Sequence, residues 1–188
     1  EKHPMNPGNV YAIRKTAADH YCAGLSKSGV LDIVRMRPFN HSGPGQSDQY
    51  VLSSFARQIA AIEAGHNEAV VRVGNLDAAR DFLHVDDVLR AYALAALNAP
   101  AGSVYNVCAG QSYPVREALD RLLALSGVAI RVEQDPARMR PSDVPEVRGS
   151  HDTLTADTGW IPEIDFDTLL HDLVNYWRTA LASESPAP

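Results

Sequence analysis

Val30-Leu31-Asp32-Ile33-Val34-Arg35-Met36 decides the fold class, because an almost continuous apolar and β-branched run is typical of a strand buried on both faces of a parallel sheet. On its N-terminal side, apolar and small residues recur at helical spacing between Asn9, the expected N-cap, and Gly29, the expected terminator. On its C-terminal side, the strand is expected to end at Arg37-Pro38. A helix followed by a buried strand predicts an α/β chain.

The alternation of helices and buried-type strands continues downstream. Helices are predicted at residues 51–64, 88–97, from 112–114 to 126, and 167–181, and strands at 70–73, 104–108 and 130–132. Residues 75–82 and 135–149 are expected to be loops, and residues 183–188 a disordered tail. Asp86 or Asp87 is the expected cap of the helix that begins at Val88.

Composition narrows the function classes. Acidic residues outnumber basic ones by 23 to 17 and no basic run occurs, so neither nucleic acid nor a membrane surface is an expected partner. No stretch approaches the ~18 apolar residues of a membrane span, and no secretory signal opens the chain. Cys22 and Cys108 lie far apart, outside any CxxC or Cys/His cluster, and the histidines are scattered. We therefore expect no disulfide, no metal site and a cytoplasmic location.

The stretch Tyr11-Ala12-Ile13-Arg14-Lys15 carries the first candidate chemistry. A tyrosine and a lysine at i and i+4 lie on one face of a helix, where the ammonium stabilises the phenolate and makes the phenol a proton donor and acceptor. The alternative is an ordinary pair of helix surface residues, because this spacing is frequent in helices. The second candidate is the loop from Phe39 to Gln49, which follows the first strand, where open α/β sheets bind ligands.

Six motifs carry a resemblance to a known family. They are Tyr11-x-x-x-Lys15, Arg37-Pro38-Phe39-Asn40-His41-Ser42-Gly43-Pro44-Gly45, Arg80-Asp81-Phe82-Leu83-His84-Val85-Asp86-Asp87, Tyr105-Asn106-Val107, Arg140-Pro141-Ser142-Asp143 and Gly159-Trp160. In this order they resemble the extended short-chain dehydrogenase/reductase family. Within it, Gly74-Asn75-Leu76-Asp77 and the residues from Phe39 to Gln46 are most similar to the GDP-6-deoxy-4-keto-mannose reductases and the GDP-mannose 4,6-dehydratases. One departure is Arg14, since the family usually has serine before the lysine.

The resemblance implies the fold and the domain organisation. It covers Glu1 to about Arg178 and corresponds to the second half of a Rossmann-type parallel sheet plus a smaller C-terminal α/β substrate-binding domain. Residues 1–43 and 84–110 would belong to the dinucleotide-binding unit, and residues 44–83 and 111–182 to the nucleotide-sugar unit. The sequence contains no GxGxxG or GxxGxxG turn, so the main dinucleotide-binding turn is expected outside this chain.

The resemblance also implies site residues, a cofactor and partners. Tyr11 would be the general acid, and Lys15 would hold the nicotinamide ribose of NADP or NAD. Pro38 and Phe39 would meet the nicotinamide. Residues expected to bind a GDP-sugar are Asn40, Arg80, Arg140 and Asp143. The complete enzyme would be a homodimer that uses the helix from Asn9 to Ser28.

Several alternatives stay open. Arg80-Asp81 can be a surface ion pair, and Arg140-Pro141 a plain turn. His41 and His84 are expected to be hydrogen-bonded structural residues, and Tyr176 and Trp177 core or interface residues. The expected activity is reduction of a GDP-4-keto-6-deoxy-hexose, and the alternatives are GDP-mannose 4,6-dehydration and sugar-nucleotide epimerisation. A further alternative is a nucleotide-sugar-binding or dimerising fragment without catalysis.

Overall fold

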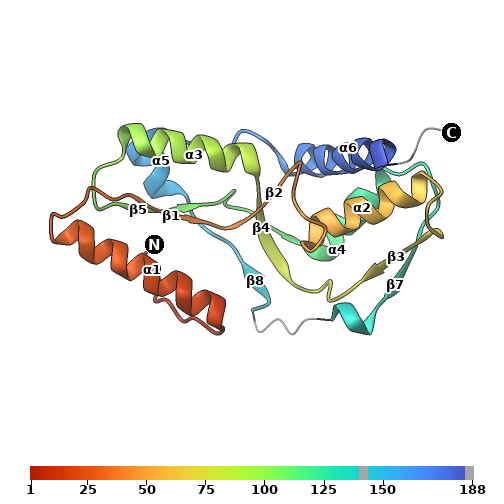
Figure 1. The fold of residues 1–188 in the computed structure, drawn as a ribbon, viewed down its shortest axis with the longest axis horizontal. Coiled ribbons are helices and arrows are strands. Elements are labelled where there is room, and N and C mark those ends of the chain that lie inside the picture. The colour runs from red at the N-terminus through yellow and green to blue at the C-terminus, as the bar shows by residue number, and fades with distance from the viewer. Residues whose placement is uncertain (140–143, 185–188) are drawn as a thin grey trace.

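A computed structural model describes residues 1–139 and 144–184, and it has an α/β architecture (Figure 1). The helices are α1 (Val10–Lys27), α2 (Val51–Glu63), α3 (Val85–Asn98), α4 (Val115–Ala124), α5 (Asp152–Thr158) and α6 (Phe166–Glu184), with a 3₁₀ turn, η1 (Pro136–Arg138). The strands are β1 (Arg35–Pro38), β2 (Asn40–Ser42), β3 (Val70–Val73), β4 (Ala79–His84), β5 (Val104–Val107), β6 (Ser112–Pro114), β7 (Arg131–Gln134) and β8 (Glu146–Val147).

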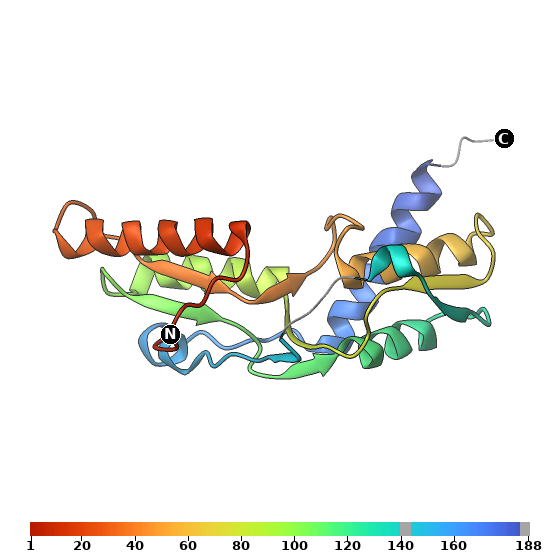
Figure 2. The same cartoon turned by 90° about the horizontal axis from the view of Figure 1, so that it is seen from below.

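The strands pair mostly in parallel, as the buried strand patterns predicted. β1 pairs with β5, β3 with β7, and β2 with β4. β4 also pairs with β8 in parallel and with β6 antiparallel. Figures 1 and 2 show β2 and β4 in the middle of the molecule, between a part with α1, β1 and β5 and a part with α2, β3 and β7. β4 thus belongs to the junction of the two parts.

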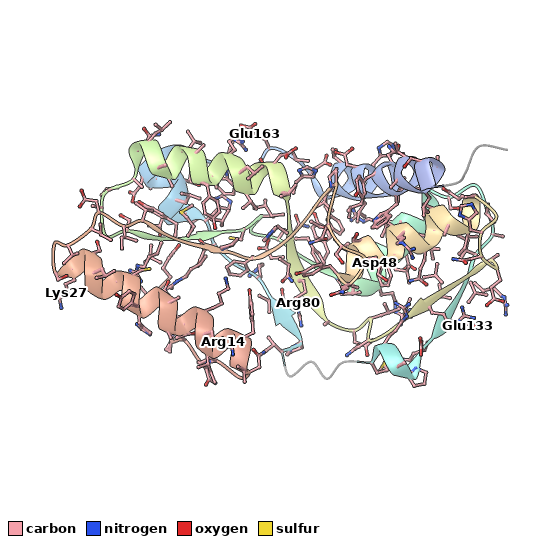
Figure 3. All side chains as sticks on the ribbon, viewed as in Figure 1. Arg14, Lys27, Asp48, Arg80, Glu133 and Glu163 are labelled. Atoms are coloured by element: carbon pink, nitrogen blue, oxygen red, sulfur yellow. The ribbon has the colours of Figure 1, made fainter. Side chains whose placement is uncertain are left out.

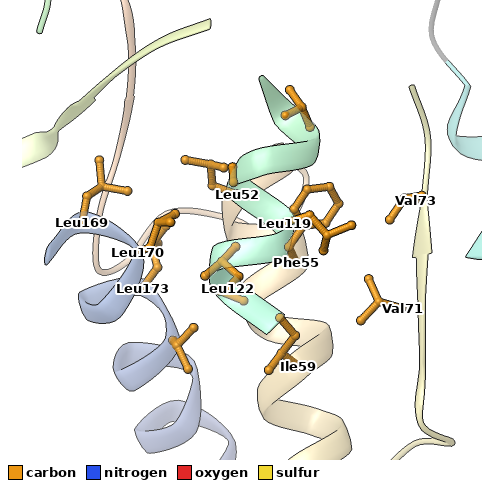
Figure 4. Close-up of a cluster of buried hydrophobic side chains, with 14 of the residues drawn as sticks. Leu52, Phe55, Ile59, Val71, Val73, Leu119, Leu122, Leu169, Leu170 and Leu173 are labelled. Atoms are coloured by element: carbon orange, nitrogen blue, oxygen red, sulfur yellow. The ribbon is translucent and has the colours of Figure 1, made fainter. Parts of the chain in front are cut away.

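Two hydrophobic clusters flank this junction. The larger one lies between α2, α4, α6 and β3, and Leu52, Ile59, Leu119 and Leu173 are among its fully buried members (Figure 4). The amphipathic spacing of these helices explains the cluster, since each presents one apolar face. The second cluster joins α3 and β5 to α5, and Trp160 is its largest buried side chain. Together the clusters fix β4, which contributes Phe82 to the first and Leu83 to the second.

The predicted first helix is confirmed in type and ends. The Asn9 side chain accepts a hydrogen bond from the Ala12 N–H at 2.8 Å, and Gly29 follows the helix with φ +73°. A positive φ of this kind favours glycine because it has no Cβ. The predicted helices near residues 51–64, 88–97 and 112–126 correspond to α2, α3 and α4.

The predicted strand at Val30–Met36 is wrong in position, since β1 begins at Arg35. The register of β1 with β5 starts at Arg35 opposite Val104, and residues 30–34 pair with no strand in the part of the chain that the structure describes. Val30 and Leu31 are 64% and 54% exposed. The apolar run therefore predicted a strand correctly, but it placed the start of the strand several residues too early.

The predicted loop over residues 75–82 is also wrong, because β4 begins at Ala79. Neither Asp86 nor Asp87 caps the next helix. The helix begins at Val85, and the His84 Nδ1 accepts a hydrogen bond from the Asp86 N–H at 3.1 Å. Asp87 is buried and instead accepts from the N–H groups of Glu163 and Ile164.

The C-terminal third contains more regular structure than predicted. The expected loop at 135–149 includes η1 and β8, and α5 was not predicted at all. The last helix extends to Glu184, so residues 183–184 are helical instead of part of a tail, and residues 185–188 lie outside the described residues. No helix among the described residues is long and apolar enough to cross a membrane.

Candidate active site

Tyr11 and Lys15 lie one turn apart on α1, and the Lys15 Nζ is 5.6 Å from the centroid of the Tyr11 ring. The Tyr11 side chain is 71% exposed, and none of the residues of α1 is buried. The helix therefore presents a phenol and an ammonium side by side on an accessible surface. Such a pair is suited to donating and accepting a proton.

The half-buried carboxylate of Asp19 links α1 to β1. Asp19 accepts two hydrogen bonds from Arg37, at 2.9 and 2.7 Å, and one from Arg35 at 2.8 Å. The hydrogen bond from Arg37 is the largest cause that lowers the pKa of Asp19 below its ordinary value of 3.8. Because Arg35 and Arg37 are both in β1, this cluster fixes the helix that carries Tyr11 to the strand that ends at Pro38.

Pro38 and Phe39 lie at the carboxyl end of β1, beside the end of β5. The Phe39 N–H donates to the Val107 carbonyl at 2.9 Å, which extends the ladder by one residue. Cys108, the residue after β5, is a buried thiol whose pKa is raised to about 12, mainly by its burial and then by the charge of Asp81. Cys108 is therefore a packing residue and not a reactive thiolate.

A cavity of about 480 Å³ opens between the start of β2, β4 and α2. Asn40 and Arg80 both line it, so the structure brings together these two predicted substrate residues, which are 40 positions apart in sequence. Polar residues that line the cavity and were not predicted are Asp48, Gln49, Ser54, Arg72, Asn75 and Arg138. Figure 3 shows Arg80 near the centre of the molecule, with Asp48 on the adjacent part.

Arg80 reaches the cavity because β4 alternates its side chains. Arg80 and Phe82 line the cavity on one face of the strand, and Asp81 lies on the other. The Arg80 Nη1 donates to the Ala79 carbonyl at 2.7 Å. Asp81 is 0% exposed and accepts hydrogen bonds from three backbone N–H groups. The alternative interpretation of Arg80-Asp81 as a surface ion pair is therefore wrong.

Arg138 also lines the cavity, together with Arg72 and Arg80. Its Nη1 lies 3.3 Å from the Ser54 Oγ, and its Nε lies 3.4 Å from an Asp135 carboxylate oxygen. The backbone of η1 packs so closely on Gly74 that a Cβ at Gly74 would clash with the Arg138 carbonyl oxygen. The predicted loop at 135–149 contained several arginines, and Arg140 was chosen because of its motif. The close approach of Gly74 is a tertiary contact that left no sequence signal.

Other residues predicted for the site lie away from the cavity or outside the described part of the chain. Among the described residues, the lining of the cavity does not include Tyr11 or Lys15, which stay on α1. Arg140 and Asp143 lie outside the described residues. The structural roles of two other side chains are confirmed: His84 is hydrogen-bonded as the cap of α3, and Trp177 packs on the larger cluster while its Nε1 donates to the Ser53 Oγ at 2.9 Å.

The chain is similar in sequence to enzymes of sugar nucleotides. A family model described as GDP-mannose 4,6 dehydratase matches residues 1–173. The chain is 42% identical to GDP-6-deoxy-D-mannose reductase of Pseudomonas aeruginosa, over 97% of this chain and 59% of the reductase. It is 27% identical to GDP-mannose 4,6 dehydratase 1 of Arabidopsis thaliana, over 93% of this chain and 48% of that protein. The chain thus spans about half the length of these curated relatives.

Structural comparisons agree with the sequence comparisons. The structure of RMD from Pseudomonas aeruginosa complexed with NADPH matches with a TM-score of 0.90 and 39% identity, over 96% of this chain and 60% of that one. UDP-glucose 4-epimerase of Thermus thermophilus, in complex with NAD, matches with a TM-score of 0.81 and 30% identity, over 96% and 57% of the two chains. The predicted α/β fold of Rossmann type is therefore confirmed.

Proposed function

Because this chain belongs to the GDP-mannose 4,6-dehydratase family, within the extended short-chain dehydrogenases/reductases, we propose that it supplies the acid-base pair and the substrate cavity of an NAD(P)-dependent enzyme that acts on a GDP-sugar. The most favoured reaction is reduction of a GDP-4-keto-6-deoxy-hexose. The observation that carries this choice is the 42% identity to a GDP-6-deoxy-D-mannose reductase over 97% of the chain. The identity to the dehydratase is lower, at 27%.

The proposed roles rest on the motifs that resemble those of the family. When bound, the nicotinamide supplies the hydride. Tyr11 donates a proton to the keto oxygen, and Lys15, one turn away, stabilises the phenolate that remains. Lys15 also holds the nicotinamide ribose, and Pro38 and Phe39, at the end of β1, contact the nicotinamide. NADP and NAD both stay open, because the structures of the two relatives contain one each.

The cavity is proposed to hold the GDP-sugar. Arg80 and Arg138 offer planar guanidinium groups, which bind diphosphate oxygens through charge-assisted hydrogen bonds. Asn40 lies at the start of β2, one residue after Phe39, and so joins the cavity to the proposed nicotinamide position. Arg140 and Asp143 remain proposed substrate residues on the strength of their motif. The corresponding units are residues 1–43 with 84–110 and residues 44–83 with 111–182, although Leu154 and Trp160 pack in the second hydrophobic cluster, against residues 88–107 of the first unit.

The direct test is turnover by a full-length enzyme that carries this chain. With a GDP-4-keto-6-deoxy-hexose, reductase activity consumes NADPH and its absorbance falls. With GDP-mannose and no added reductant, dehydratase activity produces the 4-keto sugar, and the family match makes this the second candidate. Activity in the first assay alone supports the reductase, and activity in the second alone supports the dehydratase.

For the isolated chain we propose that cofactor binding is undetectable and that turnover is absent. The sequence contains no glycine-rich turn before a helix N-terminus to hold a pyrophosphate. Calorimetric titration of the 188-residue chain with NADPH tests this proposal. Micromolar affinity would show that the cofactor site lies within these residues.

We further propose that the full-length enzyme is a homodimer that uses α1. Val10, Ile13 and Tyr21 are all more than half exposed on this helix, which is unusual for a helix of 18 residues in a packed domain. Light scattering of the full-length enzyme gives the molar mass directly. A monomer would contradict the proposal.

A further inference from the structure

Asp81 is a buried carboxylate that belongs to neither the cavity nor α1. It is 0% exposed and lies in β4 between Arg80 and Phe82, the two residues that line the cavity. Its Oδ1 accepts from the Ala109 N–H at 2.7 Å. Its Oδ2 accepts from the N–H groups of Gly110 at 3.0 Å and Gly149 at 3.2 Å. One side chain thus joins three segments that are distant in sequence.

The segment at residues 144–149 is held to β4 by few backbone hydrogen bonds. β8 pairs with β4 through only two residues, Glu146 and Val147, and the Ala79 N–H adds one bond to the Pro145 carbonyl. After β8, the Gly149 N–H bonds to the carboxylate of Asp81. The end of β1 is held independently, because its ladder with β5 continues to the Phe39 N–H and the Val107 carbonyl.

Gly149 is also packed tightly against the proposed nicotinamide side of the site. A Cβ at Gly149 would lie 2.6 Å from the Cys108 Sγ and 2.8 Å from the Phe39 Cζ. Any side chain at this position would therefore force the segment, Cys108 or Phe39 to shift. This combination aligns the strand that bears Arg80 with the segment that follows Arg140 and Asp143.

We propose that Asp81 is a positioning residue for the GDP-sugar, which fixes Arg80 and residues 144–149 relative to each other while touching neither substrate nor cofactor. The proposal rests on the proposed function. Loss of the carboxylate leaves the N–H groups of Ala109, Gly110 and Gly149 without their acceptor and removes the bond that holds Gly149 after β8, whereas β1 and Phe39 keep their own ladder. Substrate binding should therefore weaken more than cofactor binding.

The test compares Asp81→Ala with Asp120→Ala in the full-length enzyme, since Asp120 is an exposed residue on α4. For Asp81→Ala we expect the KM for the GDP-sugar to rise about tenfold and the KM for NADPH to change less than twofold. Hydrogen exchange should quicken at the amides of Ala109, Gly110 and Gly149. Asp120→Ala should match the wild type. A KM for the GDP-sugar within twofold of wild type, in a folded Asp81→Ala enzyme, would overturn the proposal.

A second variant covers the case in which Asp81→Ala does not fold. Gly149→Ala keeps the carboxylate but pushes the segment away from Cys108 and Phe39, and the same rise in the KM for the GDP-sugar is expected. An unchanged KM in this variant would also overturn the proposal. If the wild-type enzyme turns over no GDP-sugar, the proposed function fails separately. Calorimetry with GDP then replaces the KM, with a tenfold loss of affinity expected for Asp81→Ala and an unchanged affinity counting against the role of Asp81.

Discussion

The guanidinium of Arg37 donates two hydrogen bonds to the carboxylate of Asp19, from Nε at 2.9 Å and from Nη2 at 2.7 Å. This bidentate contact joins β1 to α1, and so it sets the position of the helix that carries Tyr11 and Lys15. Planar pairing of this kind is stronger and more directional than a contact between point charges. The stability of the proposed active site therefore depends on one carboxylate outside it.

Asp19→Asn should destabilise the chain by about 1.5–3 kcal/mol at neutral pH, because it weakens hydrogen bonds to two charged groups. The pKa of Asp19 is lowered in the folded state, so its stabilisation is fully present above the ordinary value of 3.8 and is lost as the pH falls through the lower folded value. Urea denaturation between pH 7 and pH 2 (roughly the range over which a carboxylate titrates) should show wild type and variant converging in acid.

The control for this change is Asp32→Asn, since Asp32 is exposed in the segment between α1 and β1. It should leave the free energy of unfolding within about 0.5 kcal/mol of wild type, as is usual for surface substitutions. A difference between wild type and Asp19→Asn that stays constant down to the lowest pH would contradict the ion-pair explanation.

Gly74→Ala should weaken GDP binding several-fold, because the new Cβ would clash with the Arg138 carbonyl oxygen and displace η1 from the cavity. The free energy of unfolding should also fall by about 1–3 kcal/mol, the usual effect of overpacking. Gly127→Ala is the matched control, since nothing lies within 4 Å of a Cβ at that position. Equal GDP affinity in both variants, measured by calorimetry, would show that η1 does not shape the cavity.

Arg80→Ala and Arg138→Ala should each weaken GDP binding by about 1.5–3 kcal/mol, the typical worth of hydrogen bonds to a charged group. The control is Arg131→Ala, because the Arg131 side chain is 75% exposed and pairs with Glu133 outside the cavity. Calorimetric titration with GDP measures all three. Wild-type affinity for GDP in both cavity variants would show that these arginines are purely structural.

The parts of the fold that the sequence predicted are those fixed by local signals. The Asn9 cap, the glycine after α1 and the helical spacing of α2 depend on neighbouring residues, and all three appear as expected. β4 was missed because Arg80-Asp81 suggests a solvated loop. The buried Asp81 is tolerated only because backbone N–H groups from distant segments meet it.

The same division holds for the candidate site. Asn40 and Arg80 were chosen from motifs, and the pairing of β2 with β4, which sets Asn40 opposite Phe82, brings them into one cavity. Arg138 was missed, since its place depends on the contact of η1 with Gly74. α5 was missed as well, because its seven residues include only one buried side chain, Leu154. Short elements that are stabilised by distant partners leave little periodicity to detect.

Tyr11→Phe is the sharpest test of the acid-base pair, because it removes one hydroxyl and keeps the ring. Since Tyr11 is 71% exposed on α1, the substitution should leave the fold unchanged. If the phenol donates the proton, turnover of the full-length enzyme should fall by roughly 10²–10⁴-fold, while the KM for the GDP-sugar changes little. One limb of the pH–rate profile should also disappear.

Lys15→Met should act differently from Tyr11→Phe, because the ammonium is assigned two tasks, the ribose of the cofactor and the stabilisation of the phenolate next to it. We therefore expect a higher KM for NADPH together with slower turnover.

Tyr21→Phe is the matched control for Tyr11→Phe, since Tyr21 is 70% exposed on the same helix and is assigned no role in the reaction. Its turnover should equal that of wild type. A Tyr11→Phe enzyme that keeps wild-type turnover with a 4-keto GDP-sugar and NADPH would show that Tyr11 is not the proton donor, because no other change accompanies the loss of its hydroxyl.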